Sequence, residues 1–421
     1  MDIPYKQLNP TEALKVYGDW LIESDSPFFK GKGNIDHHYE WYTIFYPLRT
    51  LLMCGKIFKE DRFINAAVPH MDTYISEQLP NGAFIPSYRR QPTEKLSRKE
   101  FQTILREGSA NIADAGSNLL GIMQALSFVD AGRKKRYIAA VRKWFDEWAV
   151  IWQLKDGCGN GIWEGKKINS PYTMAMANLA AAYSAFGVAT GEYEYIENAE
   201  RLISAQMPQW LPDGRPLNMS CYPMPRKEII DDYARIFYLL EGMCWTHYAS
   251  KNKKVKDAIA ARLKEWIFGK KGILTQWDCS WFNFNSGSNP PDRTYALGND
   301  LVIPGFNFNT ANPADPGYPA DRIDELMPTS RVSGVRPGWE LSKSNGIIHA
   351  FFYYLENIEE NPVLREKTEL GIKFLSNPLK ARMSYVATDL DESYGKFTIQ
   401  ATGFAGISLA QAIKRNIVFE L

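Results

Sequence analysis

The sequence has few cysteines and lacks several short motifs that mark common enzyme classes. Its five cysteines are scattered, and none forms a CxxC pair, which favours free thiols over a disulfide framework or a zinc site. The GxGxxG, P-loop, HExxH and GxSxG patterns are all absent, so no motif indicates nucleotide binding, zinc proteolysis or serine hydrolysis. One alternative stays open, namely a nucleophilic Cys158 in the loop GCGNG.

The sequence also lacks a strong excess of charge and any long apolar run. It has 49 basic and 48 acidic residues among 421, whereas a nucleic-acid-binding protein needs a strongly basic face. No apolar stretch approaches the roughly 18 residues that cross a bilayer. We therefore expect neither nucleic acid nor a membrane as a partner. Nothing in the sequence indicates an oligomeric state.

The first residues, MDIPYKQLNPTEALK, do not combine a basic region with a following apolar region. We therefore expect no export signal within this chain. The expected location is the cytoplasm, or the periplasm or the exterior if a signal peptide has been removed.

Helical periodicity of two kinds dominates the sequence. Residues 133–150 place apolar side chains on one face and charged ones between them, which is typical of a helix covered on one side. That apolar stripe consists of Tyr137, Ile138, Val141, Trp144, Phe145 and Trp148. Residues 172–188, YTMAMANLAAAYSAFGV, are apolar or small nearly all round, which predicts a helix enclosed by others.

The two kinds of helix alternate along the whole chain. The expected enclosed helices start near Asp36, Ala110, Pro171, Ile229, Leu341 and Gln400. The expected one-sided helices cover 11–24 and start again near Asp61, Arg133, Glu192, Lys251 and Pro362. Six enclosed and six outer helices predict an all-α fold, a closed ring of six helical hairpins that forms a single domain over 1–421.

Loop lengths predict which end of this ring carries the function. The links from an enclosed helix to its outer partner are brief, whereas the return links are long and cover 79–109, 153–170, 208–227 and 269–340. The last of these is a long insertion at about 269–340. The elaborated rim therefore lies at the N-terminal ends of the enclosed helices, and loops held by a rigid scaffold are where binding and chemistry concentrate.

One hairpin carries a resemblance to a known superfamily. Residues 172–206, YTMAMANLAAAYSAFGVATGEYEYIENAERLISAQ, contain a TG turn followed by a Tyr-Ile-x-x-Ala pattern. This hairpin resembles those of unsaturated glucuronyl and unsaturated rhamnogalacturonyl hydrolases, which belong to the six-hairpin glycosidase superfamily. The resemblance implies an (α/α)6 toroid. Similar helix-turn-helix segments occur in toroidal polysaccharide lyases and sugar epimerases.

Polar residues open each expected enclosed helix, and their convergence at one rim predicts a ligand site. Carboxylates on deeply packed helices are expected to cap, to pair or to act in catalysis. We predict that the following residues bind substrate at this rim: Asp36, His37, His38, Tyr42, Asn118, Asn169, Tyr172, Arg235, Lys343 and Asn345.

Three aspartates are the predicted catalytic residues. Asp114 is the first choice, because the small residues around it in ADAGSNLLG leave room for a ligand and because burial favours a proton-donating carboxyl. Asp231 or Asp232 supplies a second carboxylate, since adjacent helical residues point about 100° apart. The resemblance implies a second catalytic aspartate at the start of the next enclosed helix, where this sequence has Asn169 and Ser170.

Further side chains suit a sugar ligand. Trp163 in GNGIWEG offers a ring that can stack on a pyranose face. Arg331 and Arg336, which precede the fifth enclosed helix, would form a carboxylate clamp with Lys343 if they face inward. The pair His37 and His38 lacks a partner at metal-ligand spacing. We therefore expect no metal and no cofactor.

These features predict an enzyme, a carbohydrate-active hydrolase with an oligosaccharide substrate that is unsaturated or contains uronate. The resemblance implies hydration of a C4–C5 double bond by a proton from Asp114, followed by loss of the leaving sugar. Direct hydrolysis by Asp114 and a second acid is the variant for a saturated sugar. The alternatives are a polysaccharide lyase or sugar epimerase on the same toroid, and a non-catalytic glycan-binding protein.

Overall fold

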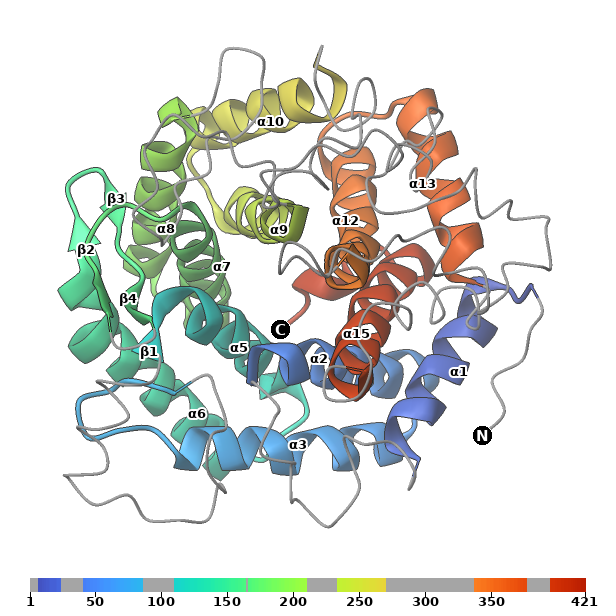
Figure 1. Cartoon of the computed structure of the whole chain (residues 1–421), viewed down its shortest axis with the longest axis horizontal. Helices are drawn as coiled ribbons and strands as arrows, with labels where there is room; N and C mark the ends of the chain where they lie inside the picture. Colours follow the sequence, from blue (N-terminus) through green and yellow to red (C-terminus); the bar gives the residue numbers. More distant parts are fainter. Residues whose placement is uncertain are drawn as a thin grey trace.

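The protein forms two concentric rings of helices. The computed structural model describes residues 7–23, 41–85, 110–163, 166–209, 233–269, 337–376 and 394–421. Within these residues it contains twelve α-helices, six inside and six outside (Figure 1). The inner helices are α2 (Trp41–Phe58), α5 (Ile112–Gln124), α7 (Thr173–Thr190), α9 (Tyr233–Ala249), α12 (Pro337–Asn357) and α15 (Tyr394–Ile413). The outer helices are α1 (Pro10–Ile22), α3 (Asp61–Ser76), α6 (Ala131–Lys143), α8 (Tyr193–Gln206), α10 (Lys253–Phe268) and α13 (Pro362–Leu375).

This arrangement confirms the predicted ring of helical hairpins. Each inner helix passes to an outer helix through a short link, as from Thr190 to Tyr193, and the chain returns through a longer one, as from Gln206 to Tyr233. The inner helices therefore all run the same way, with their N-terminal ends at the rim that carries the long connections. None of the described helices is long and apolar enough to span a membrane.

The inner helices pack closely because small residues line their contacts. Every residue of α7 from Thr173 to Gly187 is buried. A Cβ added to Gly116 of α5 would lie 2.9 Å from the Asn178 backbone of α7, and one added to Gly242 of α9 would lie 2.5 Å from the Ala177 carbonyl oxygen. Glycine at these two positions lets neighbouring helices approach with backbone against backbone.

The predicted helix over 133–150 is confirmed in extent, but its geometry changes along its length. Helix α6 ends at Lys143, and a π-helical turn (Trp144–Trp148) and a 3-10 turn (Ala149–Trp152) continue it. Its apolar stripe faces inward, where Phe145 stacks on Tyr183 of α7 with ring centroids 4.3 Å apart. The wider π turn rotates these aromatic side chains onto the inner ring.

Two inner helices begin earlier than predicted. Helix α12 begins at Pro337, where we expected Leu341, because proline is well suited to the first helical position. Helix α15 begins at Tyr394, where we expected Gln400, although Gly395 and the β-branched residues nearby disfavour a helix. Packing of α15 against α1, α2 and α12 outweighs that preference.

The return over 153–170, predicted as a long link, contains short antiparallel strands. Strand β2 (Gln153–Leu154) pairs with β3 (Gly157–Cys158). Strand β1 (Ala110–Asn111) pairs with β4 (Gly161–Trp163), which pairs with β5 (Lys166–Ile168). Strands of two or three residues are too short to show an alternating pattern, so the sequence did not reveal them. The three-stranded sheet fixes the start of α5.

Aromatic side chains fill the centre of the ring. Tyr46 of α2 packs against Phe404 of α15 at 4.1 Å and against Phe237 of α9 at 5.5 Å between ring centroids. The Tyr46 hydroxyl lies 2.6 Å from the Ser117 hydroxyl of α5. These residues form a floor across the inner ring, about one helical turn from the start of α5.

The opposite end of the ring is closed by the C-terminal segment. The 3-10 helix Ile417–Phe419 lies near the ring axis (Figure 1). Phe419 contacts Trp245 at 4.9 Å and Tyr353 at 4.6 Å between ring centroids. The Gln124 side chain donates a hydrogen bond to the Val418 carbonyl. In the described residues the ring is therefore sealed on the side of the short links.

Candidate functional site

The structure describes the side chains of four predicted site residues, namely Asp114, Asn118, Asn169 and Tyr172. Asp36, His37, His38, Asp231, Asp232, Arg331 and Arg336 lie outside the described residues. Tyr42, Trp163, Arg235, Lys343 and Asn345 belong to described helices or strands, but their side chains are not among those described. With α12 starting at Pro337, Lys343 and Asn345 lie beyond the first turn in which we expected them.

Asp114 lies in the first turn of α5 at the rim with the long connections. Its side chain is 7% exposed. Asn111 is the N-cap of this helix: its side-chain oxygen accepts a hydrogen bond from the Asp114 backbone N–H at 2.7 Å. The Asn111 amide nitrogen then donates to the Asp114 carboxylate, also at 2.7 Å. Asp114 is therefore a first-turn acid, as predicted, and Asn111 is the cap.

Two further asparagines hold the backbone around Asp114. The Asn160 carbonyl accepts from the Ile112 N–H at 3.0 Å, and the Asn160 side-chain oxygen accepts from the Ala113 N–H at 3.0 Å. The Asn178 side chain of α7 donates to the Ala113 carbonyl at 2.8 Å. The first three N–H groups of α5 thus all donate hydrogen bonds, and these bonds hold in place the backbone that carries the Asp114 carboxylate.

Asn118 lies one turn further along α5 and is fully buried. It lies beside the Tyr74 phenol of α3 and lowers the pKa of that phenol, whereas burial and the charges of Asp114 and Glu77 raise it. Neither amide atom of Asn118 has a hydrogen bond of good geometry within the described part of the chain. Its predicted contact with substrate stays a prediction.

Asn169 and Tyr172 occupy different environments. Asn169 is exposed and follows β5 directly. Tyr172 is 2% exposed, and its N–H donates to the Cys158 carbonyl at 2.9 Å. The N-cap of α7 is Tyr172, so Asn169 lies in the connection before the helix and not in its first turn. The reason is that strand β5 extends the connection before the helix begins.

Sequence reasoning missed Glu77, a second acid at the same rim. Glu77 caps the C-terminal end of α3, and one carboxyl oxygen accepts a hydrogen bond from the Trp41 indole nitrogen at 3.0 Å. Its other oxygen, Oε1, is buried and has no hydrogen-bond partner in the described part of the chain. Burial raises the pKa of Glu77 to about 8. No motif surrounds it, so the sequence offered no signal.

Asn111 was also missed, although a signal was present. An asparagine three residues before an acid, ahead of an apolar run, is the sequence pattern of a helix N-terminus. In NIADAGSN the pattern falls on Asn111 and Asp114. We predicted Asp114 as a site residue at this helix start, and Asn111 was not among the predicted residues.

The alternative of a nucleophilic cysteine finds no support. Cys158 is fully buried, and burial raises its pKa to about 12. A thiol in that state is not a nucleophile at neutral pH. Among the residues that the structure describes, no group of three or more histidine, cysteine, aspartate or glutamate side chains is placed to hold a metal ion.

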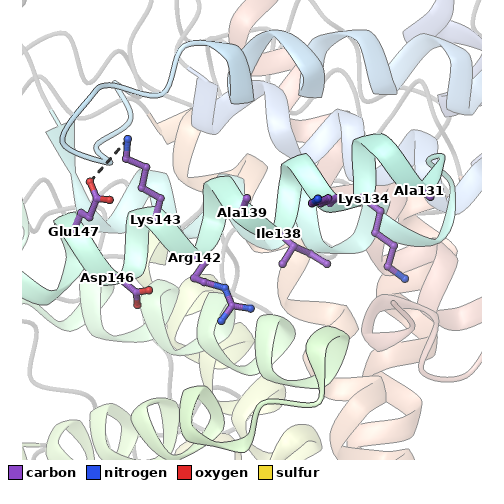
Figure 2. Close-up of a pocket in the computed structure, with 9 residues that line it drawn as sticks. Ala131, Lys134, Ile138, Ala139, Arg142, Lys143, Asp146 and Glu147 are labelled. Carbon is purple, nitrogen blue, oxygen red and sulfur yellow. Dashed lines mark ion pairs between the residues drawn. The ribbon is translucent and has the colours of Figure 1, made fainter.

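One open hollow formed by described residues lies on outer helix α6. Helix α6 and the π turn line it, with side chains that include Ile138, Arg142 and Asp146 (Figure 2). Lys143 and Glu147 form an ion pair there at 3.9 Å. None of the predicted site residues lines this open groove.

Comparison with solved structures identifies the fold. No protein-family model matches the sequence, and a search of curated proteins finds no relative. A family 76 glycoside hydrolase from a bovine Bacteroides thetaiotaomicron strain is similar in structure, with a TM-score of 0.55 and 11% identity over 96% of this chain and 78% of the other.

Two further solved structures are similar over nearly the whole of both chains. A polysaccharide lyase has a TM-score of 0.53 and 9% identity, with 96% of this chain and 98% of the other covered. A family 88 glycosyl hydrolase from Bacteroides vulgatus has a TM-score of 0.52 and 10% identity, with 96% and 99% covered. The chain therefore shares the (α/α)6 toroid fold of these solved structures.

Proposed function

We propose that this protein is a carbohydrate-active hydrolase that acts on an oligosaccharide, with the Asp114 carboxyl as an acid/base group. The observation that carries the proposal is the placement of Asp114: a buried carboxyl on a rigidly capped helix start, at the rim of the inner ring. The fold supports it, because the similar solved structures include two glycoside hydrolases.

Hydrolysis of a glycosidic bond needs a second carboxyl group across the ligand from the first. We propose Asp231 or Asp232 for this role, since both directly precede α9, whose N-terminal end lies at the same rim as that of α5. Their separation from Asp114 would decide between inversion and retention.

The proposed substrate class is a uronate-containing or unsaturated oligosaccharide. We propose that Arg331 and Arg336, which precede α12 in the sequence, bind the uronate carboxylate together with Lys343, which lies in the second turn of that helix. For an unsaturated uronide, a proton adds to the C4–C5 double bond, water adds to the resulting cation, and the hemiketal opens with loss of the leaving sugar.

A lyase or epimerase is the second candidate, since a polysaccharide lyase shares the fold. Such an enzyme needs a base that removes the C5 proton. Among the described tyrosines near Asp114, Tyr74 is unsuited to that role, because burial and two neighbouring carboxyl groups raise its pKa. Tyr42, Tyr172 and His37 are the proposed bases for this candidate.

The test compares the wild type with Asp114→Asn on saturated and unsaturated uronate oligosaccharides. We expect kcat/KM to fall by a factor of about 10² to 10⁴, while calorimetry shows retained sugar binding. Asp257→Asn, an exposed aspartate on α10, is the matched control. Ultraviolet absorbance of the C4–C5 double bond separates the candidates: it falls with an unsaturated uronide hydrolase and grows with a lyase.

Unchanged turnover in Asp114→Asn would rule out the acid/base assignment. Sugar binding without turnover in either form would indicate a glycan-binding protein instead.

A further inference from the structure

Asn111 makes two hydrogen bonds to the same residue, and together they fix its amide orientation. The Asn111 side chain caps α5 by accepting from the Asp114 N–H, so the atom at that position must be the oxygen. The nitrogen is therefore the atom that lies 2.7 Å from the Asp114 carboxylate Oδ2.

This double contact distinguishes Asn111 from the other asparagine caps. Asn9, Asn252 and Asn361 also accept from backbone N–H groups at the starts of α1, α10 and α13. Within the described residues, Asn111 is the cap whose amide nitrogen also donates to a carboxylate. Capping alone therefore does not account for the contact.

Two features of this helix start stabilise a negative charge on Asp114, whereas burial of the residue opposes it. A helix N-terminus and an amide donor both stabilise a negative charge. The Asn111 side chain is fully buried, so the amide donor is not exchanged for water. Asn160 and Asn178 hold the flanking backbone, which keeps the carboxyl in one position.

Three described titratable groups on or next to α3 are neutral at neutral pH, so they do not repel a negative charge on Asp114. Tyr74 of α3 faces it, and burial keeps this phenol neutral by raising its pKa. His70 lies one turn earlier on α3, and burial lowers its pKa to about 4, so it is neutral as well. Glu77, on the far side of Tyr74, is neutral below the pKa of about 8 that burial gives it.

We propose that Asn111 is a positioning residue that holds Asp114 ionised and in one orientation, so that Asp114 begins the reaction as a proton acceptor. This inference rests on the proposed hydrolase function and reverses the proton-donor role predicted from the sequence. The Asp114 carboxylate takes a proton from water, and the water oxygen bonds to the anomeric carbon as the glycosidic C–O bond breaks. The leaving oxygen takes its proton from a second carboxylic acid, predicted at Asp231 or Asp232.

Two substitutions separate the cap from the amide donor. Asn111→Ser keeps a capping oxygen but removes the donor, and Asn111→Asp keeps the cap and adds a second negative charge. Asn252→Ser and Asn252→Asp make the same changes at the α10 cap, where no carboxylate is bound, and serve as matched controls. Thermal melting checks that each variant is folded.

The first readout is independent of catalysis. Carbon-13 NMR of aspartate-labelled protein follows the Asp114 carboxyl, assigned by its loss in Asp114→Asn. We expect its titration midpoint to rise by about one pH unit in Asn111→Ser and by more in Asn111→Asp. Neither Asn252 variant should move it. An unmoved midpoint in both Asn111 variants would overturn the proposal.

The second readout is the pH profile of kcat/KM. If Asp114 is the proton acceptor, the acidic limb moves upward by the same amount as the NMR midpoint. If the alkaline limb moves instead, Asp114 is the proton donor and the assigned role is wrong. Absence of turnover on every glycan would reject the proposed function, while the NMR result would still decide whether Asn111 holds the charge of Asp114.

Discussion

Arg49 of α2 and Glu241 of α9 form a fully buried ion pair between opposite members of the inner ring. Both side chains are at most 1% exposed. The guanidinium makes two contacts with the carboxylate, one of them at 3.2 Å, and its Nε donates to the Gln124 side chain at 2.7 Å. Because Gln124 binds the Val418 carbonyl, the pair connects three inner helices to the segment that seals the ring.

Breaking this pair should destabilise the fold strongly. Glu241→Gln leaves the Arg49 charge buried without a partner, so we expect a loss of about 3–5 kcal/mol. Replacing both residues, as in Arg49→Met with Glu241→Leu, should cost less than the single change. Denaturant unfolding measures both. Asp257→Asn breaks the exposed Lys253–Asp257 pair and should change stability by at most about 0.5 kcal/mol.

Glu77 should make stability depend on pH. Its pKa is about 8 in the folded protein and 4.5 in the unfolded chain. Because the folded state holds the proton more tightly, this contribution is complete below about pH 4.5 and is lost as the pH rises through about 8. The slope is at most about 1.4 kcal/mol per pH unit.

The variant Glu77→Gln should remove this dependence, because its side chain cannot ionise. Melting temperatures between pH 5 and pH 9 measure the effect. The half-exposed Glu147 on the outer surface provides a control variant, Glu147→Gln, that should follow the wild type. Parallel curves for wild type and Glu77→Gln would contradict the assignment of a neutral Glu77.

Gly161 and Gly191 have nearly equal φ angles but different surroundings. Their alanine variants therefore separate the cost of backbone strain from the cost of steric crowding. Gly161 has φ of 80° and Gly191 has φ of 78°. A Cβ at Gly161 would lie 2.7 Å from the Ala110 carbonyl oxygen, whereas one at Gly191 meets nothing within 4 Å. We expect Gly191→Ala to cost about 1–2 kcal/mol through the left-handed backbone and Gly161→Ala to cost clearly more. Equal losses in thermal unfolding would argue against a tight β1–β4 contact.

Cys158 should resist alkylation in the folded protein. Its thiol is buried, and its pKa of about 12 leaves very little thiolate at neutral pH. Peptide mass spectrometry after iodoacetamide treatment should find Cys158 unmodified in native protein and modified after denaturation. Rapid labelling of native Cys158 would support the alternative that Cys158 is a nucleophile. So would a loss of turnover in Cys158→Ala with an unchanged melting temperature.

The ring was predictable because its signal repeats twelve times. The contrast between a helix such as α7, buried all round, and α6, buried on one face, recurs in each hairpin. Errors at single helix starts, such as those of α12 and α15, do not change the topology. The strands β1 and β4 were not predictable, since pairing between residues so distant in sequence leaves no local periodicity.

The site was predictable only in part, for a physical reason. Asp114 could be found because a carboxylate in an apolar helix is costly and needs an explanation. Glu77 could not, because its hydrogen-bond partner Trp41 lies on another helix. The role of Asn160 likewise depends on a turn that brings it to the start of α5.

The circular order of the hairpins has a consequence for synthesis on the ribosome. The first hairpins finish their packing only when the last helices are made, since α15 packs against α1 and α2. The Tyr17 hydroxyl of α1 also donates a hydrogen bond to the Leu375 carbonyl at the end of α13. A nascent chain that ends after α9 therefore exposes apolar flanks at both edges of an open arc. Such intermediates are prone to aggregate, so production of this protein should be sensitive to chaperone supply and to translation speed.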